Sequence, residues 1–80
     1  MTIKEFFENC AYCYHVYVYV DYEDETGKYQ SIDTRELYTD EELENFLNAY
    51  GNEEIKKWSV ENSEDDTDIT FYLKRLIDKR

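Results

Sequence analysis

The chain contains no proline and only two glycines, so it lacks the residues that mark flexible linkers and low-complexity tails. Its two cysteines, Cys10 and Cys13, are too few for the disulfide framework of a small secreted domain. No apolar run is long enough to span a bilayer, and the residues after Met1 lack the basic and apolar regions of a signal peptide. We therefore expect a single compact domain over residues 1–80 that is cytoplasmic and has no membrane partner.

Basic side chains are also scarce. Nine lysines and arginines stand against twenty acidic residues, which gives a formal net charge of −11. Four of the nine bases lie with one acid in the last seven residues, so residues 1–73 carry −14. Such a field repels nucleic acid and anionic membranes and attracts basic surfaces. We expect no direct nucleic-acid partner, and the acidity serves either to attract a basic protein or only to give solubility.

Apolar material is sufficient for a core, because hydrophobic residues make up 41% of the chain and aromatic residues 18%. At the N-terminus, Thr2 and Glu5 have the spacing of a capping box. Apolar residues at helical spacing follow and predict a helix over residues 3–13. The pattern then changes to alternation, which predicts a strand over residues 14–22.

This first strand has two different faces. Val16, Val18 and Val20 fall on one face, and Tyr17 and Tyr19 fall on the other. We expect the valine face to pack under the helices. The tyrosine face is then directed to solvent or to a partner.

A turn and a second helix come next. Gly27 is free to adopt positive φ in an acidic turn. Residues 28–34 are predicted to form the returning strand, and an extension of it to Leu37 stays open. Thr39 and Glu42 form a second capping box. The apolar stripe of a second helix follows and ends at Tyr50.

The C-terminal part predicts a second hairpin. Residues 54–61 read as a third strand, and residues 69–73 read as a fourth, although residues 69–77 also satisfy helical spacing. We favour the strand because residues 69–72 are β-formers and because a hairpin would bury Trp58. The prediction is an α+β fold of order α-β-β-α-β-β, with a four-stranded antiparallel sheet and two helices packed on one face.

Motifs that carry chemistry are weak. Cys10, Cys13 and His15 resemble part of a zinc site, but no second pair of ligands closes it. A redox role is disfavoured because Cys10 lies near a predicted helix C-terminus, where the helix dipole opposes a thiolate. Two core cysteines are the simpler reading, and metal and redox roles stay as alternatives. We expect no metal, no cofactor and no catalysis, since no nucleophile motif or phosphate-binding loop is present.

The acidic residues fall into groups whose spacing resembles that of phosphates. Carboxylates at alternate positions of a strand repeat at about 6.6 Å, and phosphates along one DNA strand are roughly 6–7 Å apart in space. A folded acidic domain can therefore imitate a row of phosphates. The candidate residues lie at the first hairpin tip (Asp21, Glu23, Asp24, Glu25), on the second helix (Glu41, Glu42, Glu44) and at the second hairpin (Glu61, Glu64, Asp65, Asp66, Asp68).

Nine tyrosines are a high number for 80 residues. Tyrosine is enriched in binding hot spots because it offers a large contact area at low entropic cost. Tyr17 and Tyr19 are therefore candidate anchors for a partner. Aromatic residues interleaved with acids fit a basic protein partner better than nucleic acid.

In size, charge and tyrosine content the chain resembles the small acidic inhibitors of phages and mobile elements, including anti-restriction and anti-CRISPR proteins. The resemblance covers no diagnostic motif and transfers no residue roles. It implies a DNA mimic that occupies the basic cleft of a nucleic-acid-binding protein. The alternative is a generic protein interaction module whose acidity gives solubility alone. A homodimer through an edge strand is compatible with either.

Overall fold

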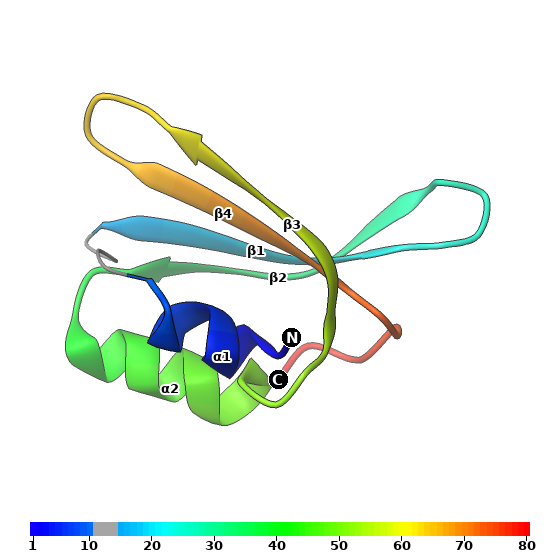
Figure 1. The fold of residues 1–80 in the computed structure, drawn as a ribbon, viewed down its shortest axis with the longest axis horizontal. Helices are drawn as coiled ribbons and strands as arrows, with labels where there is room; N and C mark the ends of the chain where they lie inside the picture. The colour runs from blue at the N-terminus through cyan, green and yellow to red at the C-terminus, as the bar shows by residue number, and fades with distance from the viewer. Residues whose placement is uncertain (11–14) are drawn as a thin grey trace.

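The computed structural model describes residues 1–10 and 15–80. Two helices and four strands confirm the predicted α+β class (Figure 1). In chain order the elements are α1 (Ile3–Glu8), β1 (Val16–Glu23), β2 (Tyr29–Leu37), α2 (Asp40–Tyr50), β3 (Ile55–Asn62) and β4 (Thr67–Leu73).

Helix α1 is shorter than the predicted helix over residues 3–13. Its capping box is present: Thr2 Oγ1 accepts a hydrogen bond from Glu5 N at 3.1 Å, and Glu5 Oε1 accepts one from Thr2 N at 3.0 Å. The helix ends early because the Asn9 side chain donates to the carbonyl oxygen of Glu5 at 2.9 Å and satisfies a group at the helix end. Residues 11–14, which include the predicted start of the first strand, lie outside the described residues.

The four strands form a mixed sheet in the order β2-β1-β4-β3. The pairs β1–β2 and β3–β4 are antiparallel, but β1 and β4 are parallel. The predicted all-antiparallel sheet is therefore wrong. The reason is that α2 carries the chain back along the sheet, so β4 runs in the direction of β1 and takes the place beside it (Figure 1).

The core lies between the sheet and the helices. Val18 and Val20 of β1 and Phe71 of β4 are fully buried on the face that α1 and α2 adjoin in Figure 1. Phe7 of α1 contacts Phe71 edge-to-face, with ring centroids 5.8 Å apart, and also contacts Phe46 of α2 at 6.1 Å. The valines predicted for the core are thus in it.

The fourth strand is confirmed as a strand, and residues 74–80 form neither helix nor strand. The expected burial of Trp58, however, is wrong. Trp58 is 49% exposed and Val60 is 46% exposed. Both belong to β3, which lies at the edge of the sheet. Among the described residues, no helix has the length and apolar character needed to cross a membrane.

Candidate protein-binding face

The surface of the sheet opposite the helices is formed by the strand positions that alternate with the core. On β1 these are Tyr17, Tyr19 and Asp21, which are half-buried and alternate with the buried valines of the same strand. We call this surface the open face. It comprises Tyr17, Tyr19, Asp21 and Glu23 of β1, Thr34 and Glu36 of β2, Lys57, Ser59 and Glu61 of β3, and Asp68, Thr70 and Tyr72 of β4.

The strand register aligns three carboxylates with Tyr17. Tyr17 pairs with Glu36 of β2 on one side and with Asp68 of β4 on the other, and Asp68 pairs with Glu61 of β3. Adjacent strands lie about 4.8 Å apart, so the positions of Asp68 and Glu61 are about 5 Å apart and those of Glu36 and Asp68 about 10 Å. We call these four residues the acidic row. The mixed topology thus brings predicted site residues from β1, β3 and β4 together.

A row of hydroxyl groups lies next to the acidic row. Tyr19 pairs with Thr34 on β2 and with Thr70 on β4, which in turn pairs with Ser59 on β3. Burial and the nearby charge of Asp68 raise the pKa of Tyr19. The Tyr19 phenol therefore stays protonated at neutral pH and is able to donate a hydrogen bond to a partner.

The third row contains the single base of the open face. Asp21 pairs with Tyr72, and Tyr72 pairs with Lys57. The Lys57 ammonium lies 4.8 Å from the Tyr72 ring centroid and forms an ion pair with Glu23. This ion pair neutralises Glu23. In the described part of the chain, Asp21 has no such base beside it, and its partial burial raises its pKa.

The three rows enclose a shallow hollow of about 340 Å³. Two phenol rings and three carboxylates surround it, together with hydroxyl groups. Aromatic rings and carboxylates both attract a lysine or arginine side chain. The lining residues are Tyr19, Asp21, Ser59, Glu61, Asp68, Thr70 and Tyr72.

An aromatic cluster extends the open face at the end where β1 begins. Tyr38, which directly follows β2, lies with its ring centroid 5.9 Å from Tyr17 and 5.2 Å from His15. A hydrogen bond with Tyr17, burial and the charge of Glu36 raise the pKa of Tyr38. Tyr38 is nevertheless 39% exposed. Aromatic side chains held by such contacts offer a rigid surface to a partner. Tyr38 was missed at the sequence level because it lies between predicted elements.

Two carboxylates that the sequence did not single out are buried. Asp33 is 5% exposed and accepts hydrogen bonds from the Tyr50 hydroxyl at 2.8 Å and from Thr34 N at 2.8 Å. Burial alone would raise the pKa of Asp33, but these hydrogen bonds and the charge of Arg35 outweigh it and lower the pKa below the usual value. Lys79 approaches the same carboxylate, at 3.7 Å.

Glu53, also 5% exposed, is the second buried carboxylate. Arg75 binds it through two hydrogen bonds of 3.0 Å, and Arg80 Nη1 lies 2.9 Å from Oε2. The hydrogen bonds from Arg75 and Arg80 outweigh burial and lower the pKa of Glu53. The basic C-terminal segment therefore forms ion pairs with acids of the same chain.

The ion pairs concentrate the bases on few acids. Six of the nine basic side chains contact only four carboxylates, those of Glu23, Asp33, Glu53 and Glu54. Most acidic side chains in residues 1–10 and 15–80 therefore keep their full charge. The acidic excess is directed outward rather than neutralised within the fold.

The two acidic hairpin tips lie at opposite ends of the sheet (Figure 1). Parallel pairing of β1 and β4 causes this separation, because one hairpin turns after β1 and the other turns before β4. Asp24 serves the first turn: its Oδ1 accepts from Thr26 N at 2.8 Å and from Lys28 N at 3.0 Å. Glu25 lies at that tip, and Glu64, Asp65 and Asp66 lie at the other.

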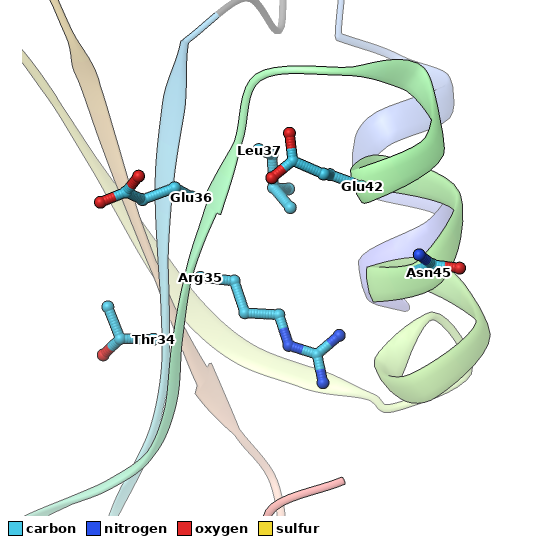
Figure 2. A pocket seen from close by; sticks show the side chains of 6 residues that line it. All are labelled: Thr34, Arg35, Glu36, Leu37, Glu42 and Asn45. Carbon is cyan, nitrogen blue, oxygen red and sulfur yellow. The ribbon is translucent and has the colours of Figure 1, made fainter.

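The predicted acids of the second helix lie away from the open face, in the first half of α2. The predicted capping box of this helix is only half formed: Thr39 Oγ1 accepts a hydrogen bond from Glu42 N at 3.1 Å, whereas Glu42 Oε1 accepts from Tyr38 N at 3.3 Å in place of Thr39 N. A second hollow of about 490 Å³ lies between α2 and β2. Figure 2 shows Arg35 extending into it while Thr34 and Glu36 point away. Glu41 and Glu44 are exposed on α2.

The described residues give no metal centre. Within residues 1–10 and 15–80, no group of three or more histidine, cysteine or acidic side chains is placed to hold an ion. Cys10 follows the end of α1 and is half-buried, and its N–H donates to Phe7 O at 3.2 Å. Cys13 lies outside the described residues.

Comparison of the chain with protein-family models, with curated proteins and with solved structures gives no match in any of the three.

Proposed function

We propose that this protein is an acidic inhibitor that binds the nucleic-acid-binding cleft of a basic protein as a DNA mimic. The observation that carries the proposal is the acidic row, in which Glu36, Asp68 and Glu61 flank Tyr17 across all four strands. A cleft lined with lysine and arginine for phosphates also attracts a row of carboxylates. Binding, not catalysis, is the proposed activity.

The distribution of charge supports this function. Bases that would otherwise screen the open face are held by Asp33 and Glu53 on the other side of the molecule. Lys57 is the one base on the open face, and it is already paired with Glu23. Long-range attraction to a basic cleft therefore acts through the open face with little internal cancellation.

The tyrosines supply contact energy that charge alone does not give. Tyr17, Tyr19 and Tyr38 lie among the carboxylates, and interface hot spots are enriched in tyrosine. In the proposed complex the carboxylates guide association and the rings provide packing. The hollow beside Tyr19 is suited to a lysine or arginine side chain of the partner.

The biological setting of the proposal is defence and counter-defence. Small size, strong acidity and a high tyrosine content resemble the anti-restriction and anti-CRISPR inhibitors of phages and mobile elements. The proposed targets are cytoplasmic effectors that bind DNA. Each of them must hold nucleic acid in a basic groove, so a DNA mimic competes directly with that substrate.

A generic protein interaction module is the second candidate. The separation of the two hairpin tips favours it, because Glu25 and Asp65 lie at opposite ends and do not form one continuous band (Figure 1). In this case the partner binds the tyrosines of the open face, and neutralising the acids has little effect on the affinity for that partner.

The test uses purified CRISPR effector nucleases and restriction endonucleases as targets. One variant neutralises the acidic row (Glu36→Gln, Glu61→Gln, Asp68→Asn). Its matched control neutralises Glu8, Glu41 and Glu44, which lie on the helices and give the same change in net charge. A DNA mimic acting through the open face binds in competition with DNA, weakens steeply with salt and is impaired by the first variant alone. Affinity that is independent of salt and of both variants would support the generic module.

A further inference from the structure

The edge strand β3 differs from the rest of the sheet in charge. It contains Lys56, Lys57 and Glu61 and has a formal charge of +1, whereas each of the other strands is net negative. In a protein of charge −11, any contact between two copies is opposed by repulsion. Strand β3 is the part of the sheet where that repulsion is weakest.

The same strand exposes apolar surface. Trp58 and Val60 are 49% and 46% exposed, although their strand partners Phe71 and Ile69 are buried in the core. The Trp58 ring also touches Phe6, with centroids 5.7 Å apart. The exposed side chains are thus continuous with the core and lie beyond the cover of the helices.

Backbone groups of β3 are directed to the free edge. Ser63 N donates to Asp66 O at 2.8 Å, which makes this a hydrogen-bonded pair at the start of the β3–β4 ladder. Because such pairs alternate along an antiparallel ladder, the N–H and C=O groups of Trp58 and Val60 point away from β4. An unpaired strand edge of this kind is a template for another strand.

We propose that this edge binds a second copy of the same chain, with β3 pairing antiparallel to β3 about a two-fold axis at Ser59. The irregularity between Ile55 and Lys57 ends the regular edge, so Lys57 to Glu61 is the segment available for pairing. Centred on Ser59, this register sets Trp58 opposite Val60 of the second copy. It also sets Lys57 opposite Glu61.

In this register apolar side chains of one copy therefore face apolar side chains of the other, and opposite charges face each other. Cross-strand pairs of these types stabilise an antiparallel contact. The contact is smaller than a standard interface of roughly 1,200–2,000 Å², so we expect a dissociation constant in the micromolar range. The dimer joins two sheets into one and doubles the open face, but it does not depend on the function proposed above.

Trp58 is the only tryptophan and reports directly on this contact. Sedimentation equilibrium and Trp58 emission are measured over the same range of protein concentration. We expect a monomer–dimer equilibrium with a parallel blue shift of the emission. Higher salt strengthens the dimer by screening repulsion between two acidic chains, whereas it weakens binding to a basic partner, so failures of the two proposals are distinguishable.

Two pairs of variants locate the contact. Val60→Lys replaces the apolar contact with Trp58 of the second copy by a charged ammonium group and weakens the dimer about tenfold or more, while Thr34→Lys adds the same charge at the other sheet edge and leaves the dimer unchanged. Under mild oxidation Ser59→Cys forms a disulfide-linked dimer, since two-fold pairing apposes the introduced thiols, and Thr34→Cys does not. Thr34 and Ser59 are the two ends of one cross-sheet row. Both cysteine variants also keep the native Cys10 and Cys13, so any cross-linking through these two residues is the same in both.

A monomer at high concentration with constant Trp58 emission would overturn the proposal. Cross-linking through Thr34→Cys as efficient as that through Ser59→Cys would do the same. A dimer that resists Val60→Lys would place the contact elsewhere and likewise reject β3 pairing. Circular dichroism of each variant verifies that it is folded.

Discussion

Tyr50 donates a hydrogen bond from its hydroxyl group to Oδ2 of Asp33 at a distance of 2.8 Å, and both residues are buried. The same hydroxyl accepts a hydrogen bond from Arg80 N at 2.7 Å. One phenol group therefore connects the last turn of α2, strand β2 and the C-terminal segment. This connection is the reason why a carboxylate is tolerated inside a small core.

The substitution Tyr50→Phe tests this connection. It keeps the buried ring but leaves Asp33 with fewer hydrogen bonds in a desolvated position, so we expect a loss of about 1–3 kcal/mol in the free energy of unfolding. Urea denaturation followed by circular dichroism measures the change. Tyr72→Phe is the matched control, because it removes a hydroxyl from the open face and is expected to change stability by less than about 0.5 kcal/mol.

The pH dependence of stability follows from the same buried acids. The pKa values of Asp33 and Glu53 are lowered in the folded protein. Their contribution is therefore complete above the unfolded values, which are near 3.8 and 4.5, and it is lost as the pH falls through the folded values. We expect the free energy of unfolding to decrease below about pH 4, measured by urea titrations at several pH values. The variant Tyr50→Phe should shift the Asp33 part of this loss to higher pH, and an unchanged profile would contradict the assignment.

The ion pairs formed by the neighbouring residues Lys74 and Arg75 should differ in their contribution to the free energy of unfolding. Arg75 binds buried Glu53, whereas Lys74 lies 3.9 Å from Glu54, which is half-exposed. Arg75→Gln removes one of the two arginines that pair with the buried Glu53 carboxylate. We expect the free energy of unfolding to fall by about 1–3 kcal/mol, and no further, because Arg80 remains as a partner. Lys74→Gln should cost less than about 1 kcal/mol. Equal losses in thermal or urea unfolding would argue against a special role for Glu53.

The sequence predicted the elements of this fold better than their arrangement. Alternation of valine and tyrosine placed β1 correctly, because one side of a strand must be buried. The parallel pair was missed because the sequence pattern allows either strand of the second hairpin to lie beside β1. Burial determines which of them does: β4 places Phe71 and Leu73 in the core, while β3 exposes Trp58 and Val60. The more apolar strand occupies the centre of the sheet.

The buried carboxylates were not distinguishable among twenty acids. Their burial depends on contacts with residues far along the chain, as between Glu53 and Arg80. A positional signal did exist for Asp33, which pairs with the core residue Val20. An acid at an inward strand position requires partners, and Tyr50 and Arg35 supply them together with the more distant Lys79.

Asp21→Asn should affect stability and binding in opposite directions. Burial raises the pKa of Asp21, so its charged form is disfavoured in the folded state and opposes stability above the folded pKa. At neutral pH the amide is therefore expected to increase the free energy of unfolding by about 0.5 kcal/mol, with the gain disappearing at low pH as Asp21 becomes protonated. The same variant removes a charge from the hollow and should weaken binding to a basic target. Comparison with Asp65→Asn, at an exposed hairpin tip, controls for net charge; a destabilising effect of Asp21→Asn would contradict the argument.

Tyr38 and Tyr29 offer a matched test of which end of the open face contacts the partner. Both are exposed, at 39% and 58%; Tyr29 is the first residue of β2, and Tyr38 directly follows its last residue. Tyr38 lies against Tyr17 beside the acidic row, whereas Tyr29 lies against Tyr72, with ring centroids 5.3 Å apart. We expect Tyr38→Ala to weaken binding to a basic effector about tenfold or more, as removal of a hot-spot tyrosine does, and Tyr29→Ala to have a smaller effect. Titration calorimetry at two salt concentrations measures both: the Tyr38 loss should persist at high salt because it comes from packing, while the electrostatic part declines. A larger loss for Tyr29→Ala would move the binding surface to the opposite end of the sheet and away from the acidic row.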